Sequence, residues 1–255
     1  MSKLKISVIT VSFNAAATIG ETLRSVASQS YGNVEHIVVD GGSTDGTVEI
    51  IRRHEAGLAR WVSEPDKGLY FAMNKGVGMA TGDVIGVLNA DDVYAGPDAL
   101  AHVAEAFQMR GVDSCYADLV YVDKRRGGVV RRWTSGEYTK GMFRKGWHPP
   151  HPTFFVRREV YERHGVFDPK FRISADYEIM LRFLERRGVS TTYIPEVLVR
   201  MRTGGLSNQS LMAIVSANVE CCRAWRRNGM AVPPLGMIWK PMSKLRQLWA
   251  RRPKR

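Results

Sequence analysis

Cysteine is scarce in this 255-residue sequence, and long apolar runs are missing from it. The three cysteines, Cys115, Cys221 and Cys222, form no CxxC pair, which argues against a zinc ribbon or a disulfide framework and indicates a reducing compartment. No run approaches the roughly 18 apolar residues that span a bilayer. The apolar stretch at residues 6–11 is also too short for the core of a signal peptide. We therefore expect a cytoplasmic protein.

Low-complexity segments, internal repeats and linkers rich in Pro, Gly or Ser are absent from the sequence as well. The hydrophobic share of 44% and the charged share of 24% are those of an ordinary globular protein, which excludes a disordered or fibrous chain. We expect one domain over residues 1–220, followed by a tail over residues 221–255.

The excess positive charge lies in that tail. The formal net charge is +12, and the tail contains ten basic and no acidic residues, which leaves +2 for the rest of the chain. If residues 241–252 form a helix, Leu245 and Trp249 share an apolar face while Lys244 and Arg251 lie opposite. This pattern favours a helix on an anionic membrane surface; packing on the body or on a partner protein is the alternative. Because no nucleic-acid-binding motif accompanies the charge, we expect no nucleic-acid partner.

Apolar strands alternate with helices through the first half of the chain. Residues 6–11 are β-branched and uncharged, as in a strand that is buried on both faces, and residues 19–27 have helical spacing. We expect further strands at 36–39, 61–62, 83–88, 114–122, 128–133, 154–156, 191–194 and 197–202, and a late helix at 177–187. The alternation predicts an α/β fold with a doubly wound, mostly parallel sheet, whose ligands bind beyond the carboxyl ends of the strands.

Acidic residues follow two of these strands. Asp91 and Asp92 are adjacent, so their mutual repulsion requires a cation, hydrogen-bond donors or solvent. A divalent ion such as Mg²⁺ or Mn²⁺, which prefers carboxylate oxygens, explains the pair; a helix N-cap is the alternative. Asp40 precedes Gly41 and Gly42, a loop that suits a nucleotide and is also ordinary turn chemistry.

Six segments carry a resemblance to a known family. In chain order they are Ile6-Ser-Val-Ile-Thr-Val-Ser-Phe-Asn14, Val38-Val-Asp-Gly-Gly-Ser-Thr-Asp-Gly-Thr47, Ser63-Glu-Pro-Asp-Lys-Gly68, Ala72-Met-Asn-Lys-Gly76, Ala80-Thr-Gly-Asp83 and Leu88-Asn-Ala-Asp-Asp92. In this order and spacing the sequence resembles the inverting family 2 glycosyltransferases of GT-A fold, over about residues 4–205. The specificity of the resemblance lies in the ordered set.

The resemblance implies a nucleotide-sugar donor (a UDP- or GDP-sugar), a divalent metal, Mn²⁺ or Mg²⁺, and transfer of one sugar with inversion. Asp92 matches the metal ligand of the family, and Asp91 matches the contact to the donor ribose or sugar. Val11, Phe13 and Asp40 match positions that bind the donor base.

Further positions are assigned by the same resemblance. Lys67 and Asn74 match positions near the donor, and His151 lies near the donor diphosphate or the acceptor. Gly41 stands where many members have a second Asp, so a side-chain contact to the base is lost there. Asp176 matches the catalytic base, which takes the proton of the acceptor hydroxyl in an inverting transfer, and it is also compatible with a helix cap.

Together these features predict a metal-dependent glycosyltransferase of polysaccharide biosynthesis in the cell envelope. The basic tail predicts peripheral binding to the inner face of the cell membrane, and a saccharide acceptor that is lipid-linked or part of a growing polysaccharide. The alternatives are a non-catalytic nucleotide-sugar-binding or assembly subunit and a nucleotidyltransferase. The latter class carries a Gly-rich, basic phosphate loop after the first strand, where this chain has Val11-Ser-Phe-Asn14.

Overall fold

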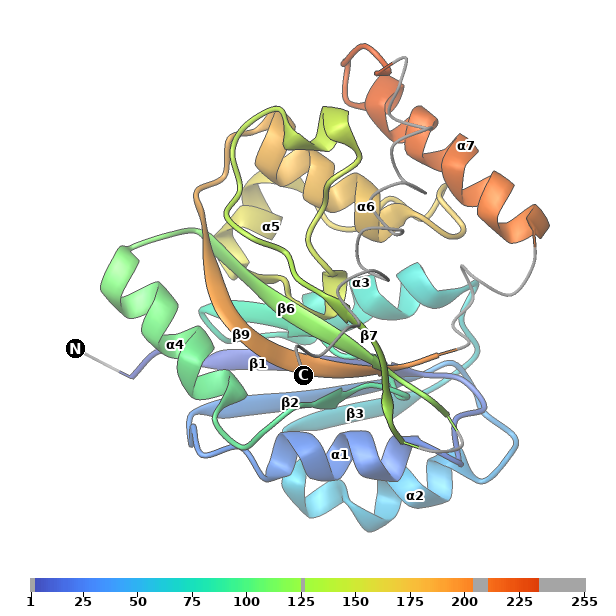
Figure 1. The fold of residues 1–255 in the computed structure, drawn as a ribbon. Helices are drawn as coiled ribbons and strands as arrows, with labels where there is room; N and C mark the ends of the chain where they lie inside the picture. The colour runs from blue at the N-terminus through green and yellow to red at the C-terminus, as the bar shows by residue number, and fades with distance from the viewer. Residues whose placement is uncertain (1–2, 125–126, 204–210, 234–255) are drawn as a thin grey trace, which may run out of the picture.

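A mixed β-sheet forms the centre of the computed structural model, which describes residues 3–124, 127–203 and 211–233 (Figure 1). Its strands are β1 (Ile6–Ser12), β2 (Val34–Asp40), β3 (Arg60–Ser63), β4 (Val84–Val87), β5 (Val93–Tyr94), β6 (Ser114–Val122), β7 (Val129–Trp133), β8 (Phe155–Arg157) and β9 (Thr191–Arg202). The order across the sheet is β3-β2-β1-β4-β8-β6-β9-β5, and β7 pairs with β6.

The first half of the sheet is parallel, as the sequence predicts. β1 pairs in parallel with β2 and β4, and β2 pairs in parallel with β3. All seven residues of β1 are buried, because the strand has neighbours on both sides and helices on both faces. The register places Ser12 opposite Asp40, so the ends of β1 and β2 reach the same edge of the sheet. Beyond β4 the pairs are antiparallel except for β6 with β9.

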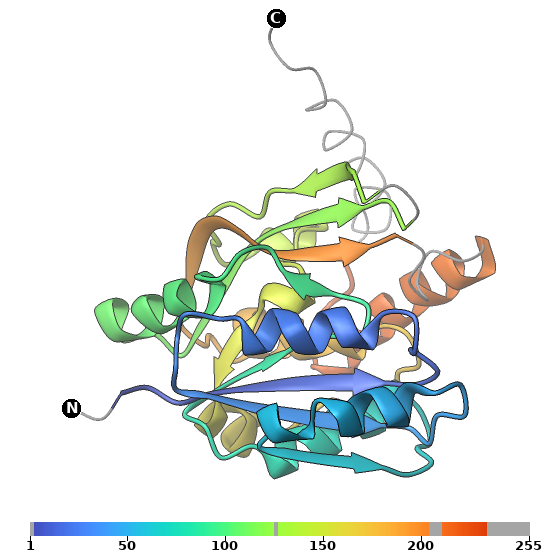
Figure 2. The same ribbon diagram turned by 90° about the horizontal axis from the view of Figure 1, so that it is seen from below.

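Helices cover both faces of this sheet. They are α1 (Ile19–Ala27), α2 (Thr47–Arg53), α3 (Leu69–Met79), α4 (Ala99–Arg110), α5 (Arg158–His164), α6 (Ala175–Met180) and α7 (Leu211–Arg227). α1 and α2 lie on one face, and α3, α5 and α6 lie on the other; Figure 2 shows the first face toward the viewer. α3 packs closely on β1, since a Cβ added at Gly76 would lie 2.4 Å from the Ile9 side chain.

Two predicted elements differ in continuity or extent, and β5, α5 and α7 were not predicted. The separate late strands are one strand, β9, whose register shifts so that Ala117 faces Ile194 and Asp118 faces Val197. Pro195, which lacks a backbone N–H, lies in this bulge and does not interrupt the strand. The predicted helix at 177–187 begins earlier, at Ala175, and continues after α6 as a π-helical segment, Leu181–Arg186.

The C-terminal part of the described chain packs on the domain. The predicted division between residues 220 and 221 falls inside α7, and Cys221 and Trp225 belong to the hydrophobic core. Residues 234–255, which include the predicted membrane-surface helix, lie outside the described residues. No helix within residues 3–124, 127–203 and 211–233 is both long enough and apolar enough to cross a membrane.

Candidate active site

Asp40, at the end of β2, organises the loop that follows it. Its buried carboxylate accepts hydrogen bonds from the hydroxyls of Ser12 (2.8 Å), Ser43 (2.5 Å) and Ser63 (2.7 Å). The backbone N–H groups of Gly42 (3.1 Å) and Ser43 (2.9 Å) also donate to it. Burial alone would raise the pKa of Asp40, but bonds from Ser43, Ser63 and Ser12 outweigh this effect and lower it. The ionised Asp40 therefore links the ends of β1, β2 and β3 through hydrogen bonds.

The loops after β1 and β2 hold each other through Asn14. Its backbone has a φ of +48°, a left-handed conformation that Asn tolerates better than most residues. The Asn14 N–H donates to the Ser43 hydroxyl (2.8 Å), and the Thr44 N–H donates to the Asn14 side chain (2.9 Å). The neighbouring Phe13 is 67% exposed, and its ring lies beside Gly41, where an added Cβ would be 3.4 Å from it. An exposed aromatic ring is a surface on which a nucleobase can stack.

Val11, the other predicted base-binding residue of this strand, is buried in the core below the loop. Its carbonyl accepts a hydrogen bond from the Ala90 N–H (3.2 Å), so the chain after β4 runs beside the end of β1. This contact brings the segment with Asp91 and Asp92 to the same edge of the sheet as Asp40.

Asp92 is a buried carboxylate whose charge is only partly compensated. It is 0% exposed, and neither of its side-chain oxygens has a hydrogen-bond partner of good geometry among the described residues. Burial and then the charge of Asp91 raise its pKa well above the ordinary value, and Asn89 and Arg202 offset only part of this. The side-chain oxygen of Asn89 is buried and unpartnered as well. Such oxygens fit a hard divalent cation, which would supply the missing positive charge.

The protein supplies few ligands for that cation. No group of three or more His, Cys, Asp or Glu side chains with metal-binding geometry occurs in the part of the chain that the structure describes. The neighbouring residue, Asp91, is half-buried and provides a second carboxylate beside Asp92 in the chain. The residues present therefore fit a metal that takes most of its oxygen ligands from a bound diphosphate and from water.

Asp176 lies in the first turn of α6 and is half-buried. One of its oxygens accepts a hydrogen bond from the Tyr177 N–H (2.8 Å), and the hydroxyl of Tyr70 on α3 lies 3.4 Å from the same oxygen. Tyr70 also donates to the Ile173 carbonyl (2.7 Å), so it fixes the turn before the helix. Its pKa is raised well above the ordinary value by burial and by the charge of Asp176, so it stays protonated as a donor.

α7 supports α6 from outside. The Glu220 carboxylate accepts hydrogen bonds from three successive backbone N–H groups, those of Arg172 (2.8 Å), Ile173 (2.9 Å) and Ser174 (2.9 Å). Ser174 is the N-cap residue of α6. These bonds hold the turn that leads into Asp176. Sequence analysis missed Glu220, because nothing in the local sequence relates it to a segment 46 residues earlier.

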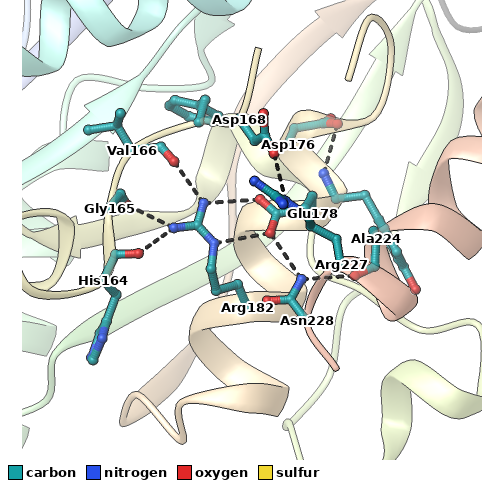
Figure 3. A network of polar contacts seen from close by, with 12 residues as sticks. His164, Gly165, Val166, Asp168, Asp176, Glu178, Arg182, Ala224, Arg227 and Asn228 are labelled. Atoms are coloured by element: carbon teal, nitrogen blue, oxygen red, sulfur yellow. Dashed lines mark hydrogen bonds and ion pairs between the residues drawn. The ribbon is translucent and has the colours of Figure 1, made fainter. Parts of the chain in front are cut away.

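A second polar network anchors the same helix (Figure 3). Arg182 donates two 3.0 Å hydrogen bonds to the buried carboxylate of Glu178, and it also binds the carbonyls of Gly165 (3.1 Å) and Val166 (2.7 Å). Asn228, just after α7, donates to Glu178 as well (3.0 Å). The network ties α6, α7 and the loop after α5 together, so α6 has little freedom to move.

The remaining predicted residues have different surroundings. His151 is buried, and its pKa is lowered by burial, an effect that the nearby charge of Asp176 opposes, so it is a neutral imidazole close to that carboxylate. Lys67 is exposed and has no hydrogen bond or ion pair within the described chain. The Asn74 side chain is engaged structurally, since it exchanges two hydrogen bonds with the backbone of Phe167 (2.8 and 2.9 Å). The predicted donor contacts of all three stay predictions.

A cluster of aromatic side chains connects the β6–β7 pair to the start of α6. His148 contacts Trp133 on β7 edge to face (5.1 Å between ring centroids) and contacts Tyr177 in the same manner (5.5 Å). Trp133 stacks beside Tyr121 on β6 (6.5 Å). Burial raises the pKa of Tyr121, and the charges of both Asp92 and Asp176 raise it further, against the effect of Arg131. Tyr121 therefore lies within electrostatic reach of both carboxylates.

Comparison with known proteins gives a consistent answer. The model of the family "Glycosyl transferase family 2" matches residues 7–165. The chain is 33% identical over 207 residues to a PGL/p-HBAD biosynthesis glycosyltransferase of Mycobacterium bovis, an alignment that covers 79% of this chain and 78% of that protein.

Two solved structures share the fold. A structure of S. aureus TarS residues 1–349 with UDP-GlcNAc superposes with a TM-score of 0.65 at 16% identity, and the match covers 88% of this chain but only 65% of that one. The mannosyltransferase PcManGT from Pyrobaculum calidifontis, in complex with GDP-Man and Mn²⁺, superposes with a TM-score of 0.65 at 22% identity over 98% of this chain and 72% of that one. At these identities the likeness is one of fold.

Proposed function

Because the chain belongs to glycosyltransferase family 2 and has the GT-A fold, we propose that it transfers one sugar from a nucleotide-diphosphate donor to a saccharide acceptor, with inversion. The donor is a UDP- or GDP-sugar, a proposal supported by the UDP-GlcNAc and GDP-Man in the two structural neighbours. The acceptor is carried on a lipid or on a growing polysaccharide.

The observation that carries this proposal is the buried, only partly compensated carboxylate of Asp92. A buried carboxylate without a partner costs several kcal/mol unless it takes up a proton, and a bound cation would remove this cost. Asp92 would hold Mn²⁺ or Mg²⁺, with Asp91 at the donor ribose or sugar. The bound ion would neutralise negative charge that develops on the leaving diphosphate. The Mn²⁺ in PcManGT supports this assignment.

Donor binding is assigned to the laced loops after β1 and β2. The exposed ring of Phe13 stacks on the base, while Asp40 acts by holding the loop, since its carboxylate is already occupied by five donors. Gly41 offers no side chain to the base, which leaves the choice between uracil and guanine to backbone groups and to other residues. Lys67 has a free ammonium group for the donor phosphates.

Asp176 is assigned as the general base. It is half-buried at the start of a helix that is held from three sides, and the oxygen that does not face Tyr70 and Tyr177 has no hydrogen bond in the described structure. That oxygen takes the proton of the acceptor hydroxyl while the hydroxyl attacks the sugar carbon and the bond to the diphosphate breaks. Burial keeps the nearby His151 neutral, so it acts as a hydrogen-bonding group.

A membrane location is supported by one face of α7 together with the basic tail. Met212, Val215 and Val219 are 74%, 56% and 51% exposed and are spaced three and four residues apart, so they form one apolar stripe. Arg223 and Arg226 follow in the last turns of the same helix. Apolar side chains beside basic ones are typical of helices that lie on an anionic lipid surface.

Donor turnover tests the proposed chemistry. We would incubate the full chain with UDP- and GDP-sugars, with and without Mn²⁺, and follow release of the nucleoside diphosphate. The expected result is metal-dependent release that falls by a factor of at least about 100 in Asp176→Asn, the typical loss of a general base, with donor binding unchanged. Asp98→Asn is the matched control, because Asp98 contacts Ser30 beyond the far end of α1.

The same experiment distinguishes a glycosyltransferase from the alternative, a non-catalytic subunit. A non-catalytic nucleotide-sugar-binding subunit would be stabilised by a donor and metal without releasing any nucleotide. Normal turnover in both Asp176→Asn and Asp92→Ala would show that the site is assigned wrongly.

A further inference from the structure

Two neighbouring arginines on β7 have opposite surroundings. Arg132 forms an ion pair with the buried carboxylate of Asp118 (3.0 Å), on one face of the β6–β7 pair. Arg131 lies on the other face and has no acidic partner among the described residues. Its guanidinium carbon instead lies 4.4 Å from the ring centre of Tyr121 and 5.6 Å from that of Trp133. Arg132 thus stabilises the fold through its ion pair, whereas no carboxylate in the described part of the chain neutralises the charge of Arg131.

The guanidinium of Arg131 contacts two aromatic rings, and its N–H groups have no hydrogen-bond acceptor among the described residues. Its Nε is buried and has no hydrogen-bond partner, and its terminal nitrogens form no hydrogen bond within the described chain. Two aromatic faces fix the plane of the group, and a cation on aromatic rings is stabilised by only about 0.5–2 kcal/mol. A planar guanidinium of this kind is suited to bind an oxyanion through two parallel hydrogen bonds.

A chain of ring contacts links this group to the segment that carries the proposed general base. From Arg131 the ring contacts run through Trp133 and His148 to Tyr177, the residue next to Asp176. The nucleobase platform, Phe13, belongs to the separate loop after β1. The ring contacts thus connect Arg131 and Trp133 on β7 to the start of the helix that carries Asp176.

We propose that Arg131, Tyr121 and Trp133 form an acceptor subsite that binds a phosphate ester. The terminal nitrogens of Arg131 bind the phosphate oxygens, and the indole of Trp133 packs against the apolar part of the acceptor. The inference rests on the proposed function, because it takes Asp176 as the group that faces the acceptor. It adds that the acceptor carries a phosphate group close to the reacting hydroxyl, as a lipid-phosphate-linked saccharide does.

Binding of a minimal phosphate ester tests the subsite without turnover. We would measure the affinity of geranyl phosphate, and of the uncharged geraniol as its matched ligand, for the full chain in the presence of UDP and Mn²⁺. We expect geranyl phosphate to bind more tightly than geraniol, and Arg131→Gln to weaken it by about tenfold or more, the loss of one charge-assisted pair. Arg131→Lys keeps the charge but not the fork, so we expect an intermediate loss.

Arg110→Gln is the matched control, because it removes one positive charge at the exposed end of α4. Equal binding of geraniol and geranyl phosphate, or an equal loss in Arg110→Gln, would overturn the subsite. A loss of UDP or GDP affinity in Arg131→Gln, with geranyl phosphate binding intact, would assign Arg131 to the donor and also overturn it. Arg131-dependent binding in a protein that turns over no donor would refute the proposed function and leave the subsite standing.

Discussion

The carboxylate of Glu220 on α7 accepts a 2.9 Å hydrogen bond from the backbone N–H of Ser174, the N-cap residue of the helix that carries Asp176. Glu220 also accepts hydrogen bonds from the N–H groups of Arg172 and Ile173, so both of its carboxylate oxygens bind this one turn. The amide of Gln would turn a donor toward one of these N–H groups. Glu220→Gln should therefore misplace Asp176 and lower kcat by about tenfold or more, with the KM of the donor unchanged.

Steady-state kinetics at varied donor concentration would check this split between kcat and KM. Glu159→Gln, an exposed substitution on α5, is the control and should leave both constants unchanged. A rise in the donor KM with an unchanged kcat would contradict a positioning role for Glu220. Part of the effect is structural, since loss of a buried charge-assisted bond also costs about 1–3 kcal/mol of stability.

Asp92→Asn should have opposite effects with and without metal. Burial and Asp91 raise the pKa of Asp92, so the ionised form opposes folding, and this cost grows as the pH rises. The neutral amide removes the cost. We expect the metal-free variant to be at least as stable as the wild type at pH 8, and to lose the rise in Tm that Mn²⁺ and UDP give the wild type. Thermal unfolding at pH 6 and 8, with and without Mn²⁺, measures both effects.

Glu35 should make the protein sensitive to acid. Burial alone would raise its pKa, but hydrogen bonds from Ser7 (2.5 Å), Thr81 (2.7 and 2.8 Å) and Lys5 (3.0 Å) lower the pKa from 4.5 to about 2. A folded pKa below the unfolded one stabilises the protein above pH 4.5, and the gain is lost as the pH falls toward 2. Glu35→Gln should cost about 3 kcal/mol at pH 7.

Urea unfolding between pH 7 and 3 would test this. The difference in unfolding free energy between wild type and Glu35→Gln should shrink steadily as the pH falls, and a constant difference would contradict the explanation. The exposed Glu162→Gln should show no comparable pH-dependent difference, because its ion pair with Arg158 is solvated.

Membrane binding should depend on the apolar stripe of α7 and on the tail. Met212→Asp should weaken sedimentation with vesicles of anionic lipid, because it places a carboxylate in the stripe. Met109→Asp on α4 is the matched control, since Met109 is 75% exposed and Met212 is 74% exposed. Deletion of residues 233–255 should release most of the protein from the vesicles. Unchanged sedimentation of the deletion variant would refute the membrane proposal.

The parallel half of the sheet was predictable because its signals are local. β1 is an uncharged β-branched run, and a strand buried on both faces requires such a run. The acidic strand ends, Asp40 and Asp92, were recognisable for the same reason, since polar residues stop each apolar run. The sequence did not reveal that the two carboxylates have different surroundings. Asp40 accepts five hydrogen bonds, whereas the Asp92 oxygens accept none of good geometry among the described residues.

The supporting and acceptor-side residues depend on contacts between distant segments. Glu220 reaches the turn before Asp176 only because α7 returns to α6. Arg131 and Arg132 are chemically identical neighbours, and only the pairing of β7 with β6 decides which of them meets Asp118. The two short strands predicted at 191–194 and 197–202 are one strand, because a bulge accommodates Pro195 within β9.

The position of Glu220 has a consequence for how the protein becomes active during synthesis. The sheet is complete once β9 ends at Arg202, but the turn before Asp176 receives its three hydrogen bonds only from residue 220. A nascent or truncated chain that stops before α7 thus has every strand and both acidic strand ends, but not the carboxylate that holds its general base in place. Such a chain also lacks Cys221 and Trp225 of the core, so α7 completes both the core and the support of the proposed general base.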